Sequence, residues 1–334
     1  SHTTSHQGVP TGALLSLAGR APALHLRRLL VVASPRVAQR ADLGVAIAHV
    51  RGRGHYVDTV VLDGTEQLEH IAQRLSYGRI DVVVAAGGDG TLNAVANVMT
   101  ETRLQGVAMA ALPLGTANDF ATGLGITGLD LGNALALAAE GKAVPIDLGR
   151  VNGRLFVNFA SGALGAEITA ETPQPLKKVM GGAAYLATGF AVSLSKRPPL
   201  VRLRAPGFSW EGRVLYIGVG NARLAGGGFE VSRNAMLDDR LLDVTILPEL
   251  GTWGDILGMV SQLVREHALP RDYSMTRQVP WLEIEALEGL QVNTDGEPMQ
   301  ATHYRFDLFE RQVPFIMTAN AQSTLTHHHT EVAA

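Results

Sequence analysis

Residues 87–91, with the sequence GGDGT, have the composition of a phosphate-binding loop. They follow a continuous apolar stretch over 81–86 and precede a helical pattern over 91–99. Glycines let the backbone approach a ligand, and a helix N-terminus offers unpaired N–H groups and a positive dipole end to phosphate. Asp89 would repel a bare phosphate, but a bridging Mg²⁺ ion removes that conflict. The pattern predicts a nucleotide loop that uses a metal; the alternative is a tight turn with an aspartate near the helix cap.

A second polar loop follows the next apolar stretch of the chain. Residues 112–120 (LPLGTANDF) offer a glycine turn, the Thr116 hydroxyl and the short side chains of Asn118 and Asp119. In open α/β sheets, ligands bind outside the carboxyl ends of the strands. Two such loops on successive strands therefore predict a nucleotide cradle. Taken alone, this segment is equally consistent with an N-cap cluster.

Two acidic turns lie in the second half of the chain. Asp295 and Glu297 flank a glycine after an apolar stretch, so one carboxylate could act as a general base for a hydroxyl while the other orients it or meets a metal. Asp238 and Asp239 lie on a turn before another apolar stretch and could hold a hard cation together with backbone carbonyls. A plain hairpin and a solvated turn are the respective alternatives.

The elements around the first two loops alternate between short apolar stretches and helical patterns. This alternation is typical of βαβ units with a parallel sheet, and continuous apolar stretches fit strands that are covered on both faces. We expect an N-terminal three-layer, doubly wound α/β domain over residues 23–147. The expected strands are 29–33, 56–62, 81–86 and 107–112, and the expected helices are 37–51, 66–75 and 91–99.

The pattern changes after Ile146. Short segments then alternate apolar with polar residues, as in 304–308 (YRFDL), which is the pattern of half-exposed antiparallel strands. Two helical patterns, 176–195 and 252–265, interrupt these segments. We expect a β-rich, antiparallel, β-sandwich-like domain over residues 148–319, with the active site in the cleft between the two domains. The expected strands are 155–160, 200–203, 213–219, 242–247, 281–286, 290–294, 303–309 and 315–318.

Composition limits the classes of function. The 334 residues are 46% hydrophobic and 18% charged with a net charge of −3, which predicts a large core and argues against nonspecific nucleic-acid binding. The absence of cysteine excludes disulfides, thiolate metal sites and cysteine nucleophiles. The longest uncharged stretch, 179–195, is shorter than the ~20 residues that a membrane span requires. We expect a cytoplasmic protein without a secretory signal and without a nucleic-acid partner.

The motifs, in this order, resemble those of the bacterial diacylglycerol-kinase-like lipid kinases, and most closely those of the YegS-type lipid kinases. GGDGT is shared with NAD kinases and sphingosine kinases, whereas PLGTANDFAT together with GGG and DGEP is more specific. The resemblance covers roughly residues 27–318. The matching segments are GGDGTLN (87–93), PLGTANDFAT (113–122), IDLGRVN (146–152), ETPQPLK (171–177), GNARLAGGG (220–228), MLDDRLLDV (236–244) and DGEP (295–298).

The resemblance implies ATP-dependent phosphorylation of a lipid hydroxyl with Mg²⁺. It implies that Glu297 accepts the proton of the hydroxyl, that Asp295 lies beside it, and that Asp89 lies near the ATP-bound metal. Asn118 joins the nucleotide-binding candidates from the second loop. The residues that the resemblance assigns to nucleotide binding are Ala86, Gly87, Gly88, Asp89, Gly90, Thr91, Leu92 and Thr116.

The resemblance also implies that the β-rich domain over 148–319 binds lipid and metal. The implied second metal site is formed by the Met236 carbonyl, the Asp239 carboxylate and the Leu241 carbonyl. The expected acceptor is a glycerol-based lipid of the diacylglycerol or phosphatidylglycerol type. A sphingoid base, a soluble alcohol such as NAD, and a non-catalytic regulator that binds nucleotide or lipid remain the alternatives. The expected partners are ATP and the lipid, with a transient contact at the inner membrane face. The sequence leaves open whether the protein forms a homodimer.

Two positions depart from the family pattern. An asparagine is common after the first strand, where this chain has Ala33-Ser34-Pro35, and a threonine is common at the end of the second strand, where it has Val60 beside Thr59. Both positions help to hold nucleotide in the family, so nucleotide affinity or preference is expected to differ here. Arg197, Arg202 and Arg204 could face anionic headgroups, although a solvated face is the simpler interpretation.

Overall fold

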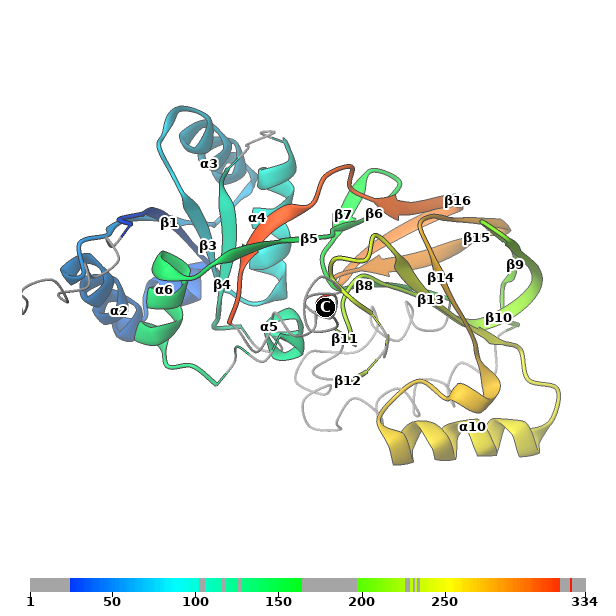
Figure 1. Cartoon of the computed structure of the whole chain (residues 1–334). Helices are drawn as coiled ribbons and strands as arrows, with labels where there is room; N and C mark the ends of the chain where they lie inside the picture. Colours follow the sequence, from blue (N-terminus) through cyan, green and yellow to red (C-terminus); the bar gives the residue numbers. More distant parts are fainter. Residues whose placement is uncertain are drawn as a thin grey trace, which may run out of the picture.

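The structure is a computed structural model, and it describes residues 25–101, 106–115, 118–124, 126, 128–163, 197–225, 229–230, 232, 235–318 and 325. An α/β domain is followed by a β-rich domain, and the end of the chain returns to the first domain (Figure 1). The expected helix over 176–195 and the site candidate Thr116 lie outside the described residues. None of the described helices combines the length and the apolarity needed to cross a bilayer.

The first domain contains a six-stranded sheet with the strand order β2-β1-β3-β4-β17-β5. All neighbouring strands are parallel except β5, which pairs with β17 in antiparallel register. The strand order reverses between β1 and β3, which is the position where open α/β sheets bind ligands. The bounds are β1 Arg28–Ala33, β2 Tyr56–Val61, β3 Val82–Gly87, β4 Ala108–Pro113, β5 Ala143–Ile146 and β17 Val313–Ile316.

The prediction that 315–318 forms a strand of the second domain was wrong. Residues Val313–Ile316 form β17, which inserts between β4 and β5 in the first sheet. Three of its four residues are buried, which fits an inner strand that is covered on both faces. The sequence of these four residues does not indicate which strand they pair with, because their partners in β4 and β5 lie more than a hundred residues earlier in the chain.

Helices cover both faces of the first sheet, which confirms the doubly wound, three-layer prediction. One buried cluster joins the sheet to α3, α4 and α5, and another joins the opposite face to α1, α2 and α6. The predicted helix over 37–51 is interrupted, because Arg40 is in an extended conformation and starts a new helix. The bounds are α1 Pro35–Ala38, α2 Ala41–Gly52, α3 Thr65–Tyr77, α4 Asp89–Glu101, α5 Asp119–Gly123 and α6 Leu131–Glu140.

The second domain is an antiparallel sheet, and strands from both edges of the sheet contribute side chains to one buried core. The strand order is β14-β13-β10-β8-β15-β16-β6-β7, and β9 lies between β10 and β15 in line with β8. Residues from β6 to β16 share a single buried cluster, so the sheet bends over itself and confirms the sandwich-like prediction. The bounds are β6 Gly149–Val151, β7 Arg154–Phe156, β8 Phe159–Ala163, β9 Leu200–Ala205, β10 Phe208–Gly220, β13 Leu242–Pro248, β14 Met275–Val279, β15 Leu282–Thr294 and β16 Glu297–Leu308.

Three further elements complete the described chain. The short strands β11 (Leu224–Ala225) and β12 (Phe229–Glu230) pair with each other. Helix α10 (Trp253–Glu266) packs on the second sheet, and a 3₁₀ turn, η1 (Arg271–Tyr273), follows it. The predicted strands 281–286 and 290–294 are one strand, β15, with a register shift between Glu285 and Leu290.

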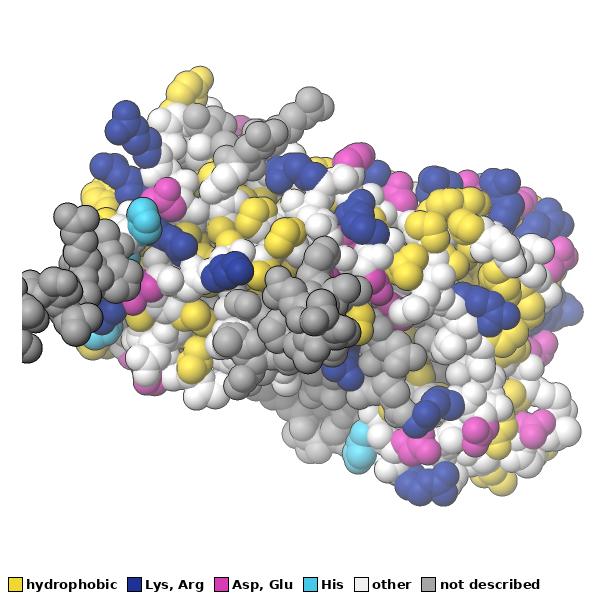
Figure 2. Space-filling view, viewed as in Figure 1, with side chains coloured by type: hydrophobic (Ala, Val, Ile, Leu, Met, Phe, Trp, Pro, Cys, Tyr) yellow, Lys and Arg dark blue, Asp and Glu magenta, His cyan; other side chains and the backbone are white. Residues whose placement is uncertain are grey.

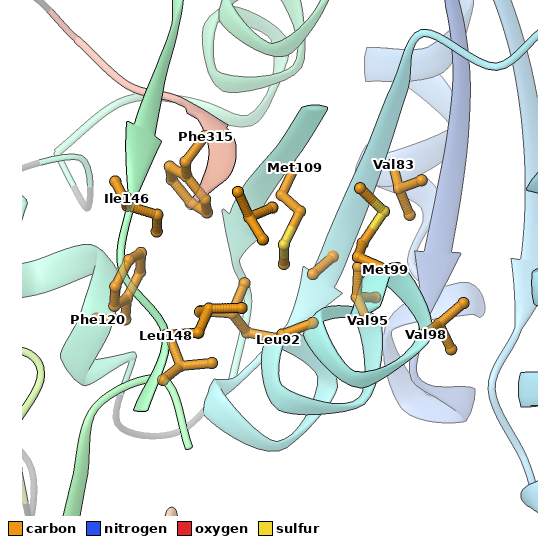
Figure 3. Close-up of a cluster of buried hydrophobic side chains, with 14 of the residues drawn as sticks. Val83, Leu92, Val95, Val98, Met99, Met109, Phe120, Ile146, Leu148 and Phe315 are labelled. Atoms are coloured by element: carbon orange, nitrogen blue, oxygen red, sulfur yellow. The ribbon is translucent and has the colours of Figure 1, made fainter. Parts of the chain in front are cut away.

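Two aromatic rings join the core of the first domain to its second loop. Phe120 of α5 and Phe315 of β17 pack edge to face with their ring centroids 5.1 Å apart. Ile146 and Leu148 lie beside them, and Leu92 of α4 points into the same cluster (Figure 3). Strand β17 therefore supports α5, which begins in the second polar loop.

We predict that the Phe315→Ala substitution lowers the free energy of unfolding by about 3–5 kcal/mol, because it leaves a cavity where Phe315 is 1% exposed. Urea denaturation measures this change. Leu287→Ala is the matched control, since Leu287 is 77% exposed and its loss should change the free energy by less than about 0.5 kcal/mol. Equal effects of the two substitutions would contradict the position of β17 in the core.

Candidate functional site

The two polar loops of the first domain lie side by side at the carboxyl ends of β3 and β4. The Leu114 N–H donates to the Gly87 carbonyl at 3.0 Å. The backbones also meet at Gly115, where an added Cβ would lie 2.6 Å from the Gly88 nitrogen. Only glycine permits this approach. The two loops therefore form one surface beside the point where the strand order reverses.

The start of α4 presents the donors expected for phosphate. The helix begins at Asp89, two residues before the predicted start, and its first internal bond joins the Leu92 N–H to the Gly88 carbonyl at 3.1 Å. The N–H groups before Leu92 have no carbonyl partner within the helix, and they lie at its positive dipole end. The local structure of residues 87–91 is thus the strand–glycine loop–helix arrangement that the sequence predicted.

Asp89 connects the first loop to the second. Its carboxylate accepts hydrogen bonds from the N–H groups of Asp119 at 2.9 Å and Phe120 at 3.2 Å. These are the first two N–H groups of α5, whose own N-cap residue Asn118 makes no side-chain capping bond. Asp89 therefore caps α5 from outside the helix. This contact satisfies donors that a helix start otherwise leaves unpaired.

Asp295 connects the second domain to α4. Its carboxylate accepts from the Asn93 amide at 2.7 Å and from the backbone N–H groups of Val157, Asn158 and Phe159 at 2.6, 3.0 and 3.2 Å. Burial raises the pKa of this carboxyl group, and the four donors oppose that effect. Asp295 itself has φ = +47°, in the left-handed region that aspartate tolerates better than most residues. The turn thus directs its carboxylate inward, toward the first domain.

Asn158 lies between the two aspartates and contacts both. Its side-chain amide donates to Asp89 at 3.0 Å, and its backbone N–H donates to Asp295 at 3.0 Å. The residue is 5% exposed, and its carbonyl accepts from the N–H groups of Asn221 and Ala222 at 2.9 Å each. Its buried side-chain Oδ1 has no hydrogen-bond partner among the described residues. Asn158 therefore joins two motifs that are about two hundred positions apart in the chain.

Glu297 lies on the exposed side of the same turn. It begins β16, and the β15–β16 hairpin pairs it with Thr294, whose hydroxyl donates to the Glu297 carbonyl at 3.3 Å. The segment is therefore a hairpin, as one interpretation held, but its two carboxylates differ in environment. Asp295 is held by four N–H groups, whereas the Glu297 side chain is exposed to solvent. Only the Glu297 carboxylate is free to contact a substrate.

Several predicted nucleotide residues could act only through the backbone. The side chains of Ala86 and Leu92 are buried in cores on opposite faces of the sheet. The Asn118 side chain bonds within its own loop, accepting from the Gly115 N–H at 2.9 Å and donating to the Gly115 carbonyl at 3.0 Å. At the two positions that depart from the family pattern, Ala33 is 2% exposed and Val60 is 8% exposed in the core. Neither offers a polar group to a ligand.

An acidic group surrounds the predicted second metal position. Burial and the nearby charges of Asp147 and Asp238 raise the pKa of Asp239 to about 6, while its bond from the Leu241 N–H at 3.0 Å opposes the shift. Burial also raises the pKa of Asp243 to about 6, and its buried Oδ2 has no partner among the described residues. Carboxylates that lie close together and partly removed from water favour the binding of a cation between them.

No three acidic or histidine side chains of the described residues converge on one point there, so a cation would also need backbone carbonyls. The predicted donors supply two of these, from Met236 and Leu241, beside the Asp239 carboxylate. The chemistry of the donor set therefore fits a hard cation.

Comparisons with known proteins agree with both halves of this description. A family model described as diacylglycerol kinase catalytic domain matches residues 29–151, and one described as YegS C-terminal NAD kinase beta sandwich-like domain matches residues 163–317. A protein of Pseudomonas aeruginosa named "probable lipid kinase YegS-like" is 41% identical over 281 residues, which are 84% of this chain and 91% of that protein. The chain belongs to the YegS-like lipid kinase family. A Pseudomonas putida relative of the same name is 40% identical over 84% of this chain and 92% of its own length.

Solved structures share the fold of this YegS-like chain. One from Bacillus anthracis superimposes with a TM-score of 0.73 at 22% identity and covers 91% of this chain and 99% of its own. Another, titled as a diacylglycerol kinase from the same organism, gives a TM-score of 0.66 at 19% identity over 88% and 98% of the two chains. At this level of identity the likeness concerns the fold.

The residues that join the two halves of this YegS-like site are asparagines that sequence reasoning did not select. Asn93 belongs to the GGDGTLN segment, but its contact with Asp295 depends on the packing of the two domains. Asn158 lies outside the segments that match the family, and Asn221 lies in GNARLAGGG (220–228) without having been assigned a role. The Asn221 amide donates to the Asp147 and Val157 carbonyls at 2.9 Å each. Their one sequence signal is an amide within otherwise apolar surroundings, which suggests a buried polar contact.

We predict opposite effects for alanine at two glycines of these loops. Gly115→Ala should lower the free energy of unfolding by about 1–3 kcal/mol, because the new methyl group would collide with the Gly88 backbone. Gly90→Ala should leave it unchanged or raise it by about 0.5–1 kcal/mol, since nothing lies within 4 Å and alanine favours a helix. Urea denaturation of both variants provides the comparison. A Gly115→Ala variant as stable as the wild type would contradict the contact between the loops.

Proposed function

We propose that this protein is an ATP- and Mg²⁺-dependent lipid kinase that phosphorylates a hydroxyl of a glycerol-based lipid, of the diacylglycerol or phosphatidylglycerol type. The contact set around Asn158 supports this proposal most strongly. It joins the GGDGT helix to the DGEP turn, so a phosphate loop and an exposed carboxylate lie at one junction. Membership of the lipid kinase family supports the choice of a lipid as the acceptor.

The first domain binds ATP in this proposal. The glycine loop and the N–H groups at the start of α4 hold phosphate oxygens, and the dipole of α4 favours their charge. A carboxylate offers about four lone-pair positions, and three described N–H groups occupy three positions on Asp89. One position on Oδ2 remains for Mg²⁺ or its water. When bound, Mg²⁺ neutralises charge that develops on the transferring phosphoryl group.

Glu297 accepts the proton in the proposed reaction. The lipid hydroxyl oxygen forms a bond to the γ-phosphorus, the bond to the β–γ bridging oxygen breaks, ADP leaves, and the hydroxyl proton moves to the Glu297 carboxylate. Asp295 is a positioning residue here, because its four N–H contacts leave it turned away from substrate and hold the hairpin in place. A carboxylate that contacts the hydroxyl is the usual requirement for such a general base.

The second cation has a structural role in this proposal. The Met236 carbonyl, the Asp239 carboxylate and the Leu241 carbonyl would hold it on the turn before β13. That turn touches the domain junction, since Asp147 accepts from the Arg240 N–H at 2.8 Å and the Arg240 guanidinium at 3.1 Å. The Asp243 Oδ2, which no described residue contacts by a hydrogen bond, supports a cation in this region.

We predict that Glu297→Gln lowers kcat by about 10²- to 10⁴-fold, the usual contribution of a general base, with little change in ATP affinity. The measurement is transfer of labelled γ-phosphate from ATP with Mg²⁺ to diacylglycerol, phosphatidylglycerol, ceramide, a sphingoid base and NAD, each in a separate assay with detergent for the lipids. Glu288→Gln, an exposed acid in the same hairpin, is the matched control and should retain normal kcat.

Near-normal turnover by Glu297→Gln would contradict its role as base. If only NAD or only the sphingoid base became labelled, that compound would be the acceptor in place of a glycerol-based lipid. ATP binding without any product would favour the non-catalytic regulator.

We predict that Mg²⁺ without ATP raises the melting temperature of the protein by several degrees, and that Asp239→Asn removes most of this increase, because binding to the folded state alone stabilises it. Thermal unfolding with and without millimolar Mg²⁺ measures the effect. Asp63→Asn, at an exposed position, should respond as the wild type does. A full Mg²⁺ response in the Asp239 variant would place the cation elsewhere.

A further inference from the structure

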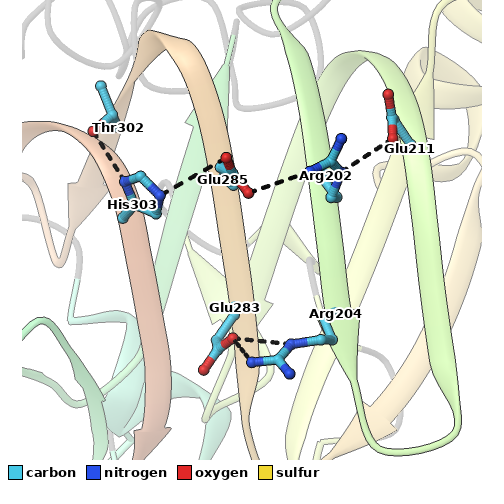
Figure 4. A network of polar contacts seen from close by, with 7 residues as sticks. All are labelled: Arg202, Arg204, Glu211, Glu283, Glu285, Thr302 and His303. Atoms are coloured by element: carbon cyan, nitrogen blue, oxygen red, sulfur yellow. Dashed lines mark hydrogen bonds and ion pairs between the residues drawn. The ribbon is translucent and has the colours of Figure 1, made fainter.

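The arginines near β9 are paired with acids. Arg202 of β9 contacts Glu211 at 3.1 Å and Glu285 at 3.6 Å, and Arg204 bonds to Glu283 (Figure 4). Glu283 also pairs with Arg305 at 2.7 Å. This face is therefore a solvated network of mixed charge. Arg202 and Arg204 therefore do not offer free cations to anionic headgroups.

Helix α10 is held on the second sheet by one side only. Its inner face places Met259 and Leu263 in a buried cluster with residues of β10 and β13. The Gln262 amide donates to Asp272 at 2.9 Å and its carbonyl accepts from the Asp272 N–H at 3.3 Å, which fixes the helix against η1. The Thr252 hydroxyl caps the helix by accepting from the Asp255 N–H at 3.1 Å. These contacts fix the inner side of the helix, and no described neighbour covers the exposed side chains of its outer face.

The outer face of α10 carries large apolar side chains in one line. Trp253 is 71% exposed, Leu257 is 68% exposed and Val264 is 45% exposed. Spacings of four and seven residues place them within about 40° of one another around a helix of 3.6 residues per turn. Met259 and Gln262 lie on the opposite side of the helix, and Leu263 lies about 80–120° from the stripe. Val260 borders the stripe and is half-buried against the same cluster. An amphipathic helix on a sheet normally exposes polar residues on its outer side, so this apolar stripe has no explanation in the packing of the fold.

We propose that the Trp253–Leu257–Val264 stripe of α10 is the surface by which this protein docks on a lipid bilayer. The inference rests on the proposed function, since a kinase that acts on a lipid must reach the bilayer that contains it. A tryptophan at one end suits the bilayer interface, where its ring is both apolar and polar. The surface of three side chains is on the order of a few hundred Å², below the ~800 Å² per partner of a stable dimer, so a second copy fits less well.

Charge around the stripe favours insertion of apolar side chains over attraction to anionic lipid. Asp255, Glu266 and Asp272 offset Arg265 and Arg271 near the helix. Acidic and basic side chains are also mixed over the face of the second domain that Figure 2 shows. The docking should therefore tolerate salt and should not require anionic headgroups.

The position of α10 suits this role. In Figure 1 it lies along the lower edge of the second domain, on the side toward which the carboxyl end of β4 and the β11–β12 pair point. A bilayer against that edge of the second domain would lie along the helix.

The test is sedimentation of the full chain with phosphatidylcholine vesicles. The wild type should bind, Trp253→Ser/Leu257→Ser should bind at least fivefold more weakly, and 0.5 M NaCl should change neither result by more than about twofold. Leu287→Ser, which alters a residue 77% exposed away from the helix, should bind as the wild type does. Circular dichroism and the urea midpoint confirm that the variants are folded; if the double variant is not, Leu257→Ser alone replaces it.

Three results would overturn the proposal: no binding by the wild type, equal binding by the α10 variant, or binding that requires anionic lipid and disappears in salt. Sedimentation velocity adds a fourth. If the wild type is a dimer and the α10 variant is a monomer, the stripe binds a second copy of the chain and not a bilayer. Phosphorylation of a short-chain, water-soluble diacylglycerol should be unchanged in the α10 variant. If no acceptor is phosphorylated while vesicle binding follows the predicted pattern, the proposed function fails and the docking surface stands.

Discussion

A buried carboxylate needs hydrogen-bond donors, and the arrangement of this site depends on that requirement. Asp295 is removed from water at the junction of the domains, where four N–H groups compensate for its lost hydration. Two of these belong to the segment before β8, one to the first residue of β8 and one to α4. Only the Asn93 bond requires the two domains to be packed together, because the other three donors lie in the same domain as Asp295. Because an unpaired buried polar group costs about 1–3 kcal/mol, the Asn93 contact favours the packed position of the two domains.

The same junction controls the second polar loop. Asn158 links Asp295 to Asp89, and Asp89 caps α5, a helix of five residues that would not be stable alone. On its other side, α5 packs its Phe120 ring edge to face against Phe315 of the last strand. The return of the chain end to the first sheet is therefore part of the support of the site. The exposed Glu297 gains a defined position from these contacts although its own side chain takes no part in them.

The sequence was sufficient for the class of fold and for the motifs, since those depend on local periodicity and on short segments. Alternation of apolar stretches and helical patterns predicted the doubly wound domain, and GGDGT predicted the loop and helix that β3 and α4 form. The sequence was insufficient for features that depend on contacts between residues far apart in the chain. The place of Val313–Ile316 and the role of Asn158 depend on residues more than sixty positions away, and no local pattern identifies those partners. The exposed stripe on α10 has helical spacing like any buried face, so only the packing distinguishes the two.

The most direct test of this account is the kinetic effect of Asn158→Leu, a substitution of similar volume that removes the amide between Asp89 and Asp295. The measurement is kcat for lipid phosphorylation together with the dissociation constant of ATP, in protein shown to be folded. The account predicts that kcat falls at least tenfold while ATP affinity changes less than about threefold, because removing one buried hydrogen bond to a carboxylate costs about 1.5–3 kcal/mol and here disturbs the alignment of the two halves. A folded variant with wild-type kcat would contradict the claim that this asparagine joins them into one site.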